Sequence, residues 1–238
     1  MIDIHSHIIP NIDDGSNRIE ESYEMLKKAN NAGFTEIITT SHYIEGTYIT
    51  NSNAKNAILE KLNQFAKENS INMQLHNGSE IYITLNMVNL LEQKEASTLA
   101  NSKYVLFELP MNNNVIYLDE CIFELKSKGY IPIIAHPERY RIVQQDFKIV
   151  TEWINKGAYM QCNYMSIIGN YGNMAKKTVK NLLKNNLVHL LGSDAHNIEG
   201  YSHIKKCVKK IQKYIGKDRF EQISTINPLH IIKNEDIW

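Results

Sequence analysis

The stretch Met1-Ile-Asp-Ile-His5-Ser-His7-Ile-Ile-Pro-Asn-Ile-Asp13-Asp14-Gly15 places two histidines and two adjacent aspartates at the end of a short apolar run. Residues 1–4 are predicted to form a first β-strand. In extended chain, side chains two residues apart point to the same side, so His5 and His7 can bind one ion together. A lone His-x-His pair is a weak sign of metal binding, and ordinary polar residues beside a strand explain it as well. The rest of the chain decides between these interpretations.

Short apolar or β-branched runs alternate with amphipathic stretches along the whole chain. The predicted strands are residues 1–4, 35–40, 72–76, 104–107, 131–135, 158–162 and 188–191. The predicted helices are one capped by Ser16 or Asn17 and ended by Gly33, and then residues 54–69, 85–91, 115–128, 147–156, 174–186, 202–215 and 217–223. Residues 228–238 give no clear prediction. This alternation indicates an α/β fold with a parallel sheet, closed as a seven-stranded barrel whose functional site lies at the carboxyl ends of the strands.

The length, composition and net charge of the chain exclude several classes of protein. The chain has 238 residues and 43% hydrophobic composition, which suits a single domain over residues 1–238. Lys plus Arg and Asp plus Glu both total 26, so bulk charge predicts no nucleic-acid partner. No apolar run reaches the roughly 18 residues of a spanning helix, so no membrane insertion is expected. Three distant cysteines, Cys121, Cys162 and Cys207, argue against a disulfide framework and favour a cytoplasmic protein.

Metal-capable side chains follow six of the seven predicted strands, so a barrel would gather them at one rim. They are His5, His7, Asp14, His42, Glu80, Glu108, His136, Asp194 and His196. Imidazoles mixed with carboxylates suit Zn²⁺, Mn²⁺ or Fe²⁺ better than Ca²⁺ or Mg²⁺. Nine ligands are too many for one ion, so we expect two or three ions, with Glu80 as a candidate bridge. Such clusters act on phosphoesters, where the ions activate water and hold phosphate oxygens.

Two neighbours of these residues have alternative interpretations. Of Asp13 and Asp14, one is expected to bind metal and the other to cap the turn before Gly15. Arg139, in His136-Pro-Glu-Arg-Tyr, can bind a phosphate oxygen through its planar guanidinium, or it forms a salt bridge to Glu138 or another acid. We favour the phosphate role.

Cysteine-based phosphate chemistry is excluded by the spacing of the cysteines. That chemistry needs an Arg six residues after the nucleophile, but Ser127, Ile168 and Lys213 stand at those positions. If the chain removes phosphate, activated water must be the nucleophile.

Other residues are expected to have ordinary structural roles. Tyr43, Tyr48 and Tyr164 either line the rim or pack in the core. The lysines of residues 202–215 are expected to form the solvent face of an amphipathic helix, with docking of an acidic partner segment as the alternative. Those lysines are Lys205, Lys206, Lys209, Lys210 and Lys213.

Taken together, the motifs resemble the polymerase and histidinol phosphatase (PHP) superfamily, and within it the bacterial capsule-locus metal-dependent protein-tyrosine phosphatases. The matching pieces run in order along the chain. They are the opening stretch, Thr40-Ser-His42, Gly78-Ser-Glu80, Phe107-Glu-Leu-Pro110, Ile134-Ala-His-Pro-Glu-Arg-Tyr140 and Ser193-Asp-Ala-His-Asn197.

The resemblance implies a distorted seven-stranded PHP barrel with three metal ions, most often Mn²⁺, and Fe or Zn as alternatives. It implies three ligand sets: His5, His7, Glu80 and Asp194; Glu80, Glu108 and His136; and Asp14, His42 and His196. Arg139 would meet the phosphate. For the acid we expect Asp14 or His196, or water on the third ion. The implied substrate is phosphotyrosine on the tail of a bacterial tyrosine kinase that controls capsule or exopolysaccharide synthesis.

The chain departs from the family pattern at two places. Family members commonly carry an arginine shortly after the Glu of Gly-Ser-Glu, where Ile81 and Tyr82 stand here, and another a few residues after Asp-Ala-His-Asn, where residues 198–201 have none. Two alternatives therefore stay open: a small-molecule phosphatase of the histidinol phosphatase type, and a weakly catalytic regulator that binds a phosphorylated kinase. Homo-oligomerisation is also open.

Overall fold

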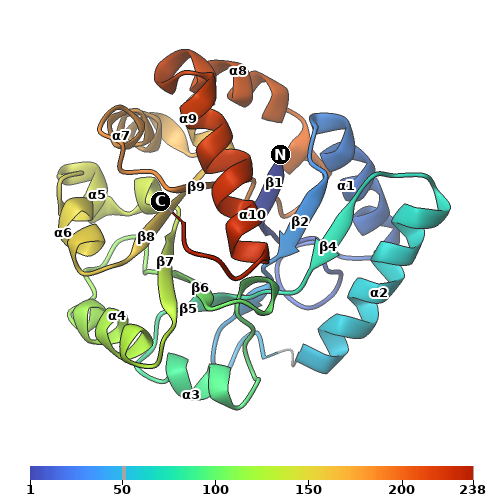
Figure 1. Ribbon diagram of the computed structural model, residues 1–238, viewed down its shortest axis with the longest axis horizontal. Coiled ribbons are helices and arrows are strands. Elements are labelled where there is room, and N and C mark those ends of the chain that lie inside the picture. Colours follow the sequence, from blue (N-terminus) through green and yellow to red (C-terminus); the bar gives the residue numbers. More distant parts are fainter. Residues whose placement is uncertain (50–51, 238) are drawn as a thin grey trace.

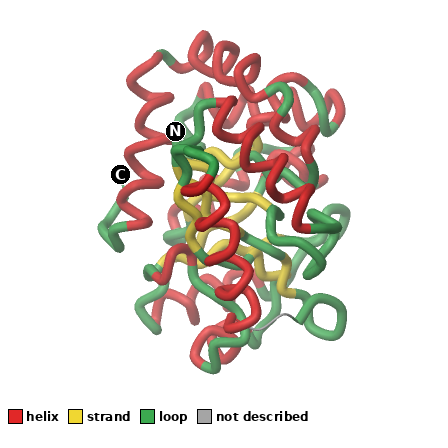
Figure 2. The backbone as a smooth tube through the Cα atoms, turned by 90° about the vertical axis from the view of Figure 1, so that its right-hand side faces the viewer, coloured by secondary structure: helices red, strands yellow, loops and turns green. Residues whose placement is uncertain are grey.

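The protein is described by a computed structural model that covers residues 1–49 and 52–237 (Figure 1). Its described strands pair in parallel and form two adjoining sheets that curl into a barrel, with helices around it (Figure 2). In chain order they are β1 (Ile2–Ser6), β2 (Glu36–Thr39), β3 (His42–Tyr43), β4 (Gln74–His76), β5 (Glu80–Tyr82), β6 (Tyr104–Glu108), β7 (Ile131–Ala135), β8 (Tyr159–Asn163) and β9 (Leu190–Gly192). The predicted α/β barrel in one domain is confirmed.

The strands divide into two ladders, β1-β2-β4 and β3-β5-β6-β7-β8-β9. A parallel bridge between Ser6 and Ala195 links the first strand to the end of the last, which closes the ring. Within residues 1–49 and 52–237, nine strands replace the seven predicted because two of those seven are interrupted. The second splits into β2 and β3, and the third into β4 and β5, so the predicted number of strand positions around the ring holds.

The interruption between β4 and β5 leaves little room for a side chain at Gly78. A Cβ on Gly78 would lie 3.0 Å from Ile38 Cγ2 and 3.0 Å from the carbonyl oxygen of Thr39. At the other interruption, the Ser6 amide donates to Thr40 Oγ1 at 2.9 Å and the Thr40 amide donates to the Ser6 carbonyl at 2.8 Å. Because of these interruptions, His42 lies on the short strand β3 and Glu80 on the short strand β5. The sequence had predicted both residues to follow a strand.

The helices follow the strands as crossovers. They are α1 (Ile19–Ala32), α2 (Ser52–Glu68), α3 (Met87–Glu92), α4 (Leu118–Ser127), α5 (Arg141–Gln145), α6 (Ile149–Asn155), α7 (Gly172–Lys184), α8 (Ile204–Ile215), α9 (Lys217–Glu221) and α10 (Asn227–Ile232). The predicted cap of α1 is wrong, because the helix begins after Arg18 and Ser16 instead donates to the Arg18 carbonyl at 3.0 Å. Gly33 ends α1 with φ 103°, as predicted.

The amino-terminal end of the barrel is closed by α10 and the tail that follows it (Figure 1). Ile231 and Ile237 pack in an apolar cluster with Ile2, Ile4 and Leu190. Tyr104 Oη, at the start of β6, accepts from the Ile237 amide at 3.1 Å and donates to the Glu235 carbonyl at 2.8 Å. Access to the barrel interior is therefore confined to the opposite, carboxyl end of the strands.

The described helices include none with the length and apolar character needed to traverse a bilayer.

Candidate metal centre

The nine residues singled out in the sequence all reach the carboxyl end of the barrel. His5 lies on β1, His42 on β3 and Glu80 on β5, and Glu108 ends β6. The others lie in the loops that follow the strands: His7, Asp14, His136, Asp194 and His196. Distances between their nitrogen and oxygen atoms show which of them approach one another.

The deepest set consists of four buried side chains. Glu80 Oε2 lies 3.1 Å from His5 Nε2 and 3.3 Å from His7 Nε2, and the two imidazole nitrogens are 3.2 Å apart. Asp194 Oδ1 lies 3.5 Å from both nitrogens. Ligands held about 2.1 Å from one ion are separated from each other by about 3.0–3.4 Å, so this set has the spacing of a coordination sphere.

The outer nitrogens of these imidazoles are already bonded. His5 Nδ1 donates to Gln161 Oε1 at 2.8 Å, and His7 Nδ1 donates to Asp13 Oδ2 at 2.8 Å. In the neutral rings each Nε2 therefore carries a lone pair, and both lone pairs point toward Glu80. Metal-binding histidines are oriented by partners of this kind. Three electron-rich atoms this close repel one another unless a cation lies between them.

A second group surrounds the other side of Glu80. His136 Nε2 lies 2.9 Å from Glu80 Oε1 and 3.8 Å from Glu108 Oε2. His42 Nδ1 lies 3.2 Å from Glu80 Oε2 and 3.3 Å from Glu108 Oε1. Glu80 therefore faces four imidazoles from three different segments, as expected of a bridging ligand.

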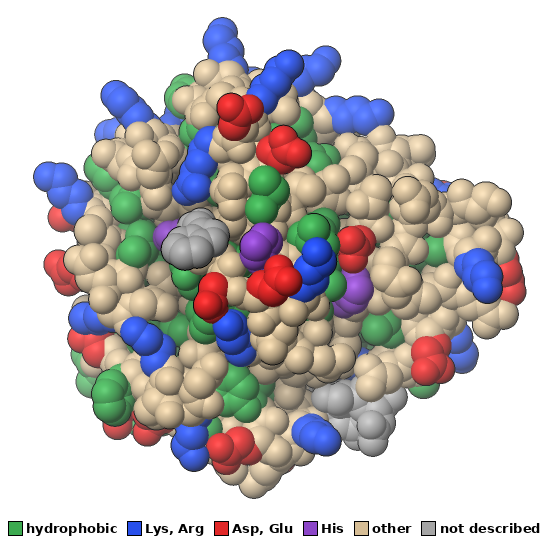
Figure 3. All heavy atoms as spheres, viewed as in Figure 1, with side chains coloured by type: hydrophobic (Ala, Val, Ile, Leu, Met, Phe, Trp, Pro, Cys, Tyr) green, Lys and Arg blue, Asp and Glu red, His purple; other side chains and the backbone are tan. Residues whose placement is uncertain are grey.

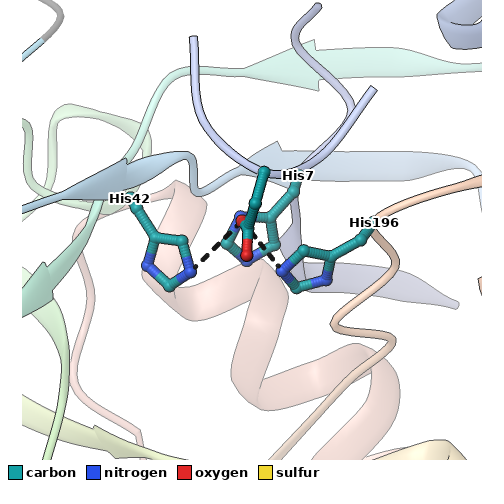
Figure 4. A group of neighbouring side chains, drawn as sticks. His7, His42 and His196 are labelled. Carbon is teal, nitrogen blue, oxygen red and sulfur yellow. Dashed lines mark ion pairs between the residues drawn. The ribbon is translucent and has the colours of Figure 1, made fainter. Parts of the chain in front are cut away.

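The third group lies nearest to solvent. Figure 4 shows His7, His42 and His196 converging. Asp14 Oδ1 is 3.3 Å from His196 Nε2 and 3.6 Å from His42 Nε2. The Asp14 side chain is 54% exposed and that of His196 is 27% exposed. This group includes His7, which the sequence assigned only to the deep set.

Electrostatics show that the carboxylates of this centre attract positive charge. Burial lowers the pKa of His5, but the Glu80 and Asp194 carboxylates outweigh it and raise that pKa to about 9. Burial and the neighbouring Glu80 carboxylate raise the pKa of Glu108 to about 9. Glu80 Oε2 is buried and accepts no hydrogen bond. Divalent cations would balance the carboxylates in place of those protons and fill the position that Glu80 Oε2 faces, so the donor set fits transition-metal ions.

Two of these residues have backbone conformations that are uncommon outside glycine. His136 has φ 33° and Asp194 has φ 53°. Such angles persist only where surrounding contacts hold them. The Tyr140 hydroxyl holds the first, since it donates to the Ala135 carbonyl at 2.7 Å and accepts from the Leu109 amide at 2.9 Å. Strain of this kind is found at functional sites.

Asp13 and Asp14 have separate roles. Asp13 Oδ1 accepts from the Gly15 amide at 3.0 Å, and its Oδ2 accepts from the His42 amide at 2.9 Å and from His7. Those hydrogen bonds outweigh the effect of burial and lower the pKa of Asp13 to about 2. Asp13 therefore caps the turn and orients His7, whereas Asp14 faces the imidazoles.

Arg139 lies at the edge of the deep set. Its Nη1 is 2.7 Å from Asp194 Oδ2, and its guanidinium carbon lies 4.6 Å from the centre of the Tyr171 ring. The salt bridge given as the alternative role of Arg139 is present, but its partner is Asp194 and not Glu138. Glu138 is buried and instead accepts from the Asn163 amide at 2.8 Å. The Arg139 side chain remains 26% exposed, so it faces the mouth.

Sequence reasoning missed the contribution of β8, the strand without metal-capable residues. Gln161 orients His5, and Asn163 Nδ2 donates to Asp194 Oδ2 at 2.7 Å. The signal was present, because two polar residues at a spacing of two interrupt an otherwise apolar strand. Of the three tyrosines, Tyr48 stacks near His42 with ring centres 6.0 Å apart, while Tyr164 is fully buried and Tyr43 nearly so.

A parallel barrel with buried histidine and carboxylate clusters at its carboxyl end has the architecture and donor set of a metal-dependent hydrolase. The family model described as "Capsular polysaccharide synthesis, CpsB/CapC" matches residues 1–233. The chain therefore belongs to the CpsB/CapC family, and the resemblance read from the motifs is confirmed.

Known proteins similar to this chain agree with that assignment. The tyrosine-protein phosphatase CpsB of Streptococcus pneumoniae is 32% identical over 241 residues, covering 99% of this chain and 99% of CpsB. A solved structure from work on YwqE of Bacillus subtilis and CpsB of S. pneumoniae, described as metal-dependent tyrosine phosphatases, superposes with a TM-score of 0.94. It is 31% identical and covers 100% of this chain and 96% of that chain. A histidinol phosphate phosphatase of Lactococcus lactis, at 16% identity and a TM-score of 0.54, shares the fold; the match covers 88% of this chain and 93% of that chain.

Proposed function

We propose that this chain is a metal-dependent protein-tyrosine phosphatase that hydrolyses phosphotyrosine on the tail of a bacterial tyrosine kinase in capsular or exopolysaccharide synthesis. Residues 1–238 act as one catalytic domain. The observation that carries the proposal is the buried Glu80 carboxylate facing imidazole nitrogens of His5, His7 and His42 at 3.1–3.3 Å, in a chain of the CpsB/CapC family. The tyrosine phosphatases similar to it support the substrate class.

The proposed cofactor is a cluster of three divalent ions, with Mn²⁺ as the principal metal. His5, His7, Glu80 and Asp194 would hold the first ion, and Glu80, Glu108 and His136 the second. Asp14, His42 and His196 would hold the third, with His7 beside them. When bound, the ions lower the pKa of water and neutralise phosphate oxygens.

The residues of the chain position the phosphate. Arg139 is held between the Asp194 carboxylate and the Tyr171 ring, so its guanidinium needs little reordering to meet a phosphate oxygen. The arginines that family members commonly carry are absent after Glu80 and Asn197. Arg139 is therefore the one guanidinium that pairs with this cluster among the described residues. We therefore assign phosphate binding chiefly to Arg139.

The leaving group is released on the exposed side of the centre. A phenolate has a conjugate acid of pKa about 10, so it needs less protonation than an alkoxide. Asp14 and His196 lie on this side, and the His196 ring is oriented because its Nδ1 donates to the Asp194 carbonyl at 3.0 Å. We assign to these two groups the positioning of the proton donor, either one of them when not bound to metal or a water that they hold beside the departing oxygen.

A comparison of substrates tests this proposal. The purified chain, supplied with Mn²⁺, is assayed with a phosphotyrosine peptide and with histidinol phosphate. We expect kcat/KM to be higher for the peptide and to fall to background in His136→Ala. Higher turnover of histidinol phosphate would make the chain a small-molecule phosphatase. Tight peptide binding without phosphate release would make it a regulator.

A further inference from the structure

Helices α7 and α8 have an unusual charge composition. Together they carry nine lysines and no acidic residue, although the chain as a whole has zero net charge. In Figure 3 the Lys and Arg side chains gather along the edge of the molecule over these helices. Like charges this close repel each other and lower stability. A solvated helix face does not require such segregation of charge, whereas a surface that binds an anionic partner does.

The two helices form a groove with a volume of about 690 Å³. Its floor is Ile167, which is buried, and one wall is Tyr214, which is 49% exposed. Five lysines and no acidic residue complete the lining: Lys176, Lys180, Lys184, Lys210 and Lys213. Among the described residues, none of these five forms an ion pair within 4 Å, whereas lysines elsewhere, such as Lys103 and Lys156, pair with aspartates. The groove therefore presents unneutralised positive charge on a concave surface.

The groove begins close to the mouth of the barrel. The turn Tyr164–Ile168 leads directly from β8, whose Asn163 bonds Asp194, to the floor of the groove. Tyr171, which contacts Arg139, immediately precedes α7. Lys176 is five residues further on, about 7.5 Å along the helix axis. Lys180 and Lys184 continue the row by about another 12 Å.

We propose that this groove binds an acidic segment of the phosphoprotein substrate, adjacent in sequence to the phosphotyrosine. The proposal rests on the function proposed above. Extended peptide advances about 3.3–3.6 Å per residue. A phosphotyrosine at Arg139 would therefore place acidic side chains along the lysine row when they begin about three residues away and continue for about four. The concave shape, apolar floor and aromatic wall favour a peptide over a flat anionic bilayer.

The test uses two kinds of phosphotyrosine peptide. The acidic peptides carry four glutamates that begin three residues before or three residues after the phosphotyrosine, and the neutral peptides carry glutamines at the same positions. At low ionic strength we expect KM of the wild-type protein to be about 10-fold lower for an acidic peptide, with kcat unchanged. The preference should disappear at high salt, because the groove is open to solvent. Lys180→Gln/Lys210→Gln should remove most of the preference and leave turnover of p-nitrophenyl phosphate unchanged. These substitutions relieve repulsion, so the melting temperature should hold or rise.

The matched control is Lys27→Gln/Lys61→Gln, which removes the same charge from α1 and α2. It should retain the preference. Equal KM values for acidic and neutral peptides in wild type, or an equal loss in both double variants, would overturn the proposal. Binding of phosphatidylglycerol vesicles through Lys180 and Lys210, without any peptide preference, would overturn it in favour of a membrane site.

A second measurement separates this proposal from the proposed function. Fluorescence anisotropy follows binding of a labelled, unphosphorylated glutamate-rich peptide to wild type and to both double variants. Binding that depends on Lys180 and Lys210 would support the groove even if no phosphotyrosine peptide were hydrolysed. If the protein hydrolyses phosphotyrosine but does not bind this peptide, the proposed role of the groove is rejected and the proposed phosphatase function stands.

Discussion

The two ends of the barrel are built from the same strands but hold opposite kinds of side chain. At the amino end, Ile2, Leu190, Ile231 and Ile237 form a dry apolar cluster beneath α10. At the carboxyl end, the same strands present imidazoles and carboxylates whose lone pairs face one another. The first arrangement stabilises the fold by burial, and the second needs bound cations. Stability and chemistry are therefore separated along the barrel axis, and substitutions at the two ends should have different consequences.

The largest effect is expected from Glu80→Gln at the carboxyl end. The loss of a bridging carboxylate should lower kcat/KM by on the order of 10²–10³-fold or more, and should abolish the rise in melting temperature that Mn²⁺ gives the wild type. Circular dichroism should show an intact fold. The matched control is Glu36→Gln at the opposite end, where Glu36 Oε2 pairs with His76 Nε2 at 2.8 Å. A comparable loss of activity in both variants would break the comparison.

At the amino end, Ile231→Ala should have the reverse profile. Ile231 is fully buried, so its truncation should lower the free energy of unfolding by about 2–4 kcal/mol. Because α10 lies away from the mouth, kcat/KM per folded molecule should stay near that of wild type. Urea unfolding and Mn²⁺-supported hydrolysis measure the two quantities. The partly exposed Ile226 provides a milder Ile→Ala control. Loss of catalysis in the folded Ile231→Ala protein would show that the two ends are coupled.

A smaller effect on stability is predicted for Lys55 on α2, which lies between the two ends of the barrel. Its buried ammonium donates to the Gly78 carbonyl and to Ser79 Oγ at 3.0 Å, just before Glu80. Burial lowers the pKa of Lys55 from 10.5 to about 8. Between those pH values the unfolded chain binds more protons than the folded protein. The contribution of Lys55 to stability should therefore rise from pH 8 to 10.5, by roughly 1–3 kcal/mol.

The measurement is the free energy of unfolding as a function of pH for wild type and Lys55→Met, in chelator. The difference between the two should grow in favour of wild type as pH rises through this window. Lys61→Met, exposed on the same helix, should show no such trend. A parallel pH dependence in wild type and Lys55→Met would mean that Lys55 does not titrate in the folded protein.

Much of the fold was predictable because it follows from local pattern. Apolar runs separated by amphipathic stretches located every strand position, and Gly33, Gly129 and Gly157 ended helices where expected. The breaks inside the second and third strands were not predictable, because they depend on contacts such as Gly78 against Ile38. The single-turn helix α5 and the short α10 were missed because neither is long enough to show a helical period.

The membership of the site was predictable, and its internal arrangement was less so. Repeated placement of histidines and carboxylates after strands identified the residues that converge. The salt bridge from Arg139 to Asp194 joins residues 55 positions apart, and Glu138, the neighbour in sequence, turns away. Gln161 and Asn163 were missed because amides do not stand out as metal-site residues until the imidazole and carboxylate that they orient are seen.

Metal content of the purified chain tests the central claim most directly. Elemental analysis before and after chelation, followed by titration with Mn²⁺, measures how many ions the carboxyl end holds. We predict more than one and up to three equivalents per chain, with fewer in Glu80→Gln, unchanged binding in Glu36→Gln, and recovery of phosphotyrosine hydrolysis as the ions return. A chain that holds no transition metal and hydrolyses substrate equally well in chelator would contradict the account.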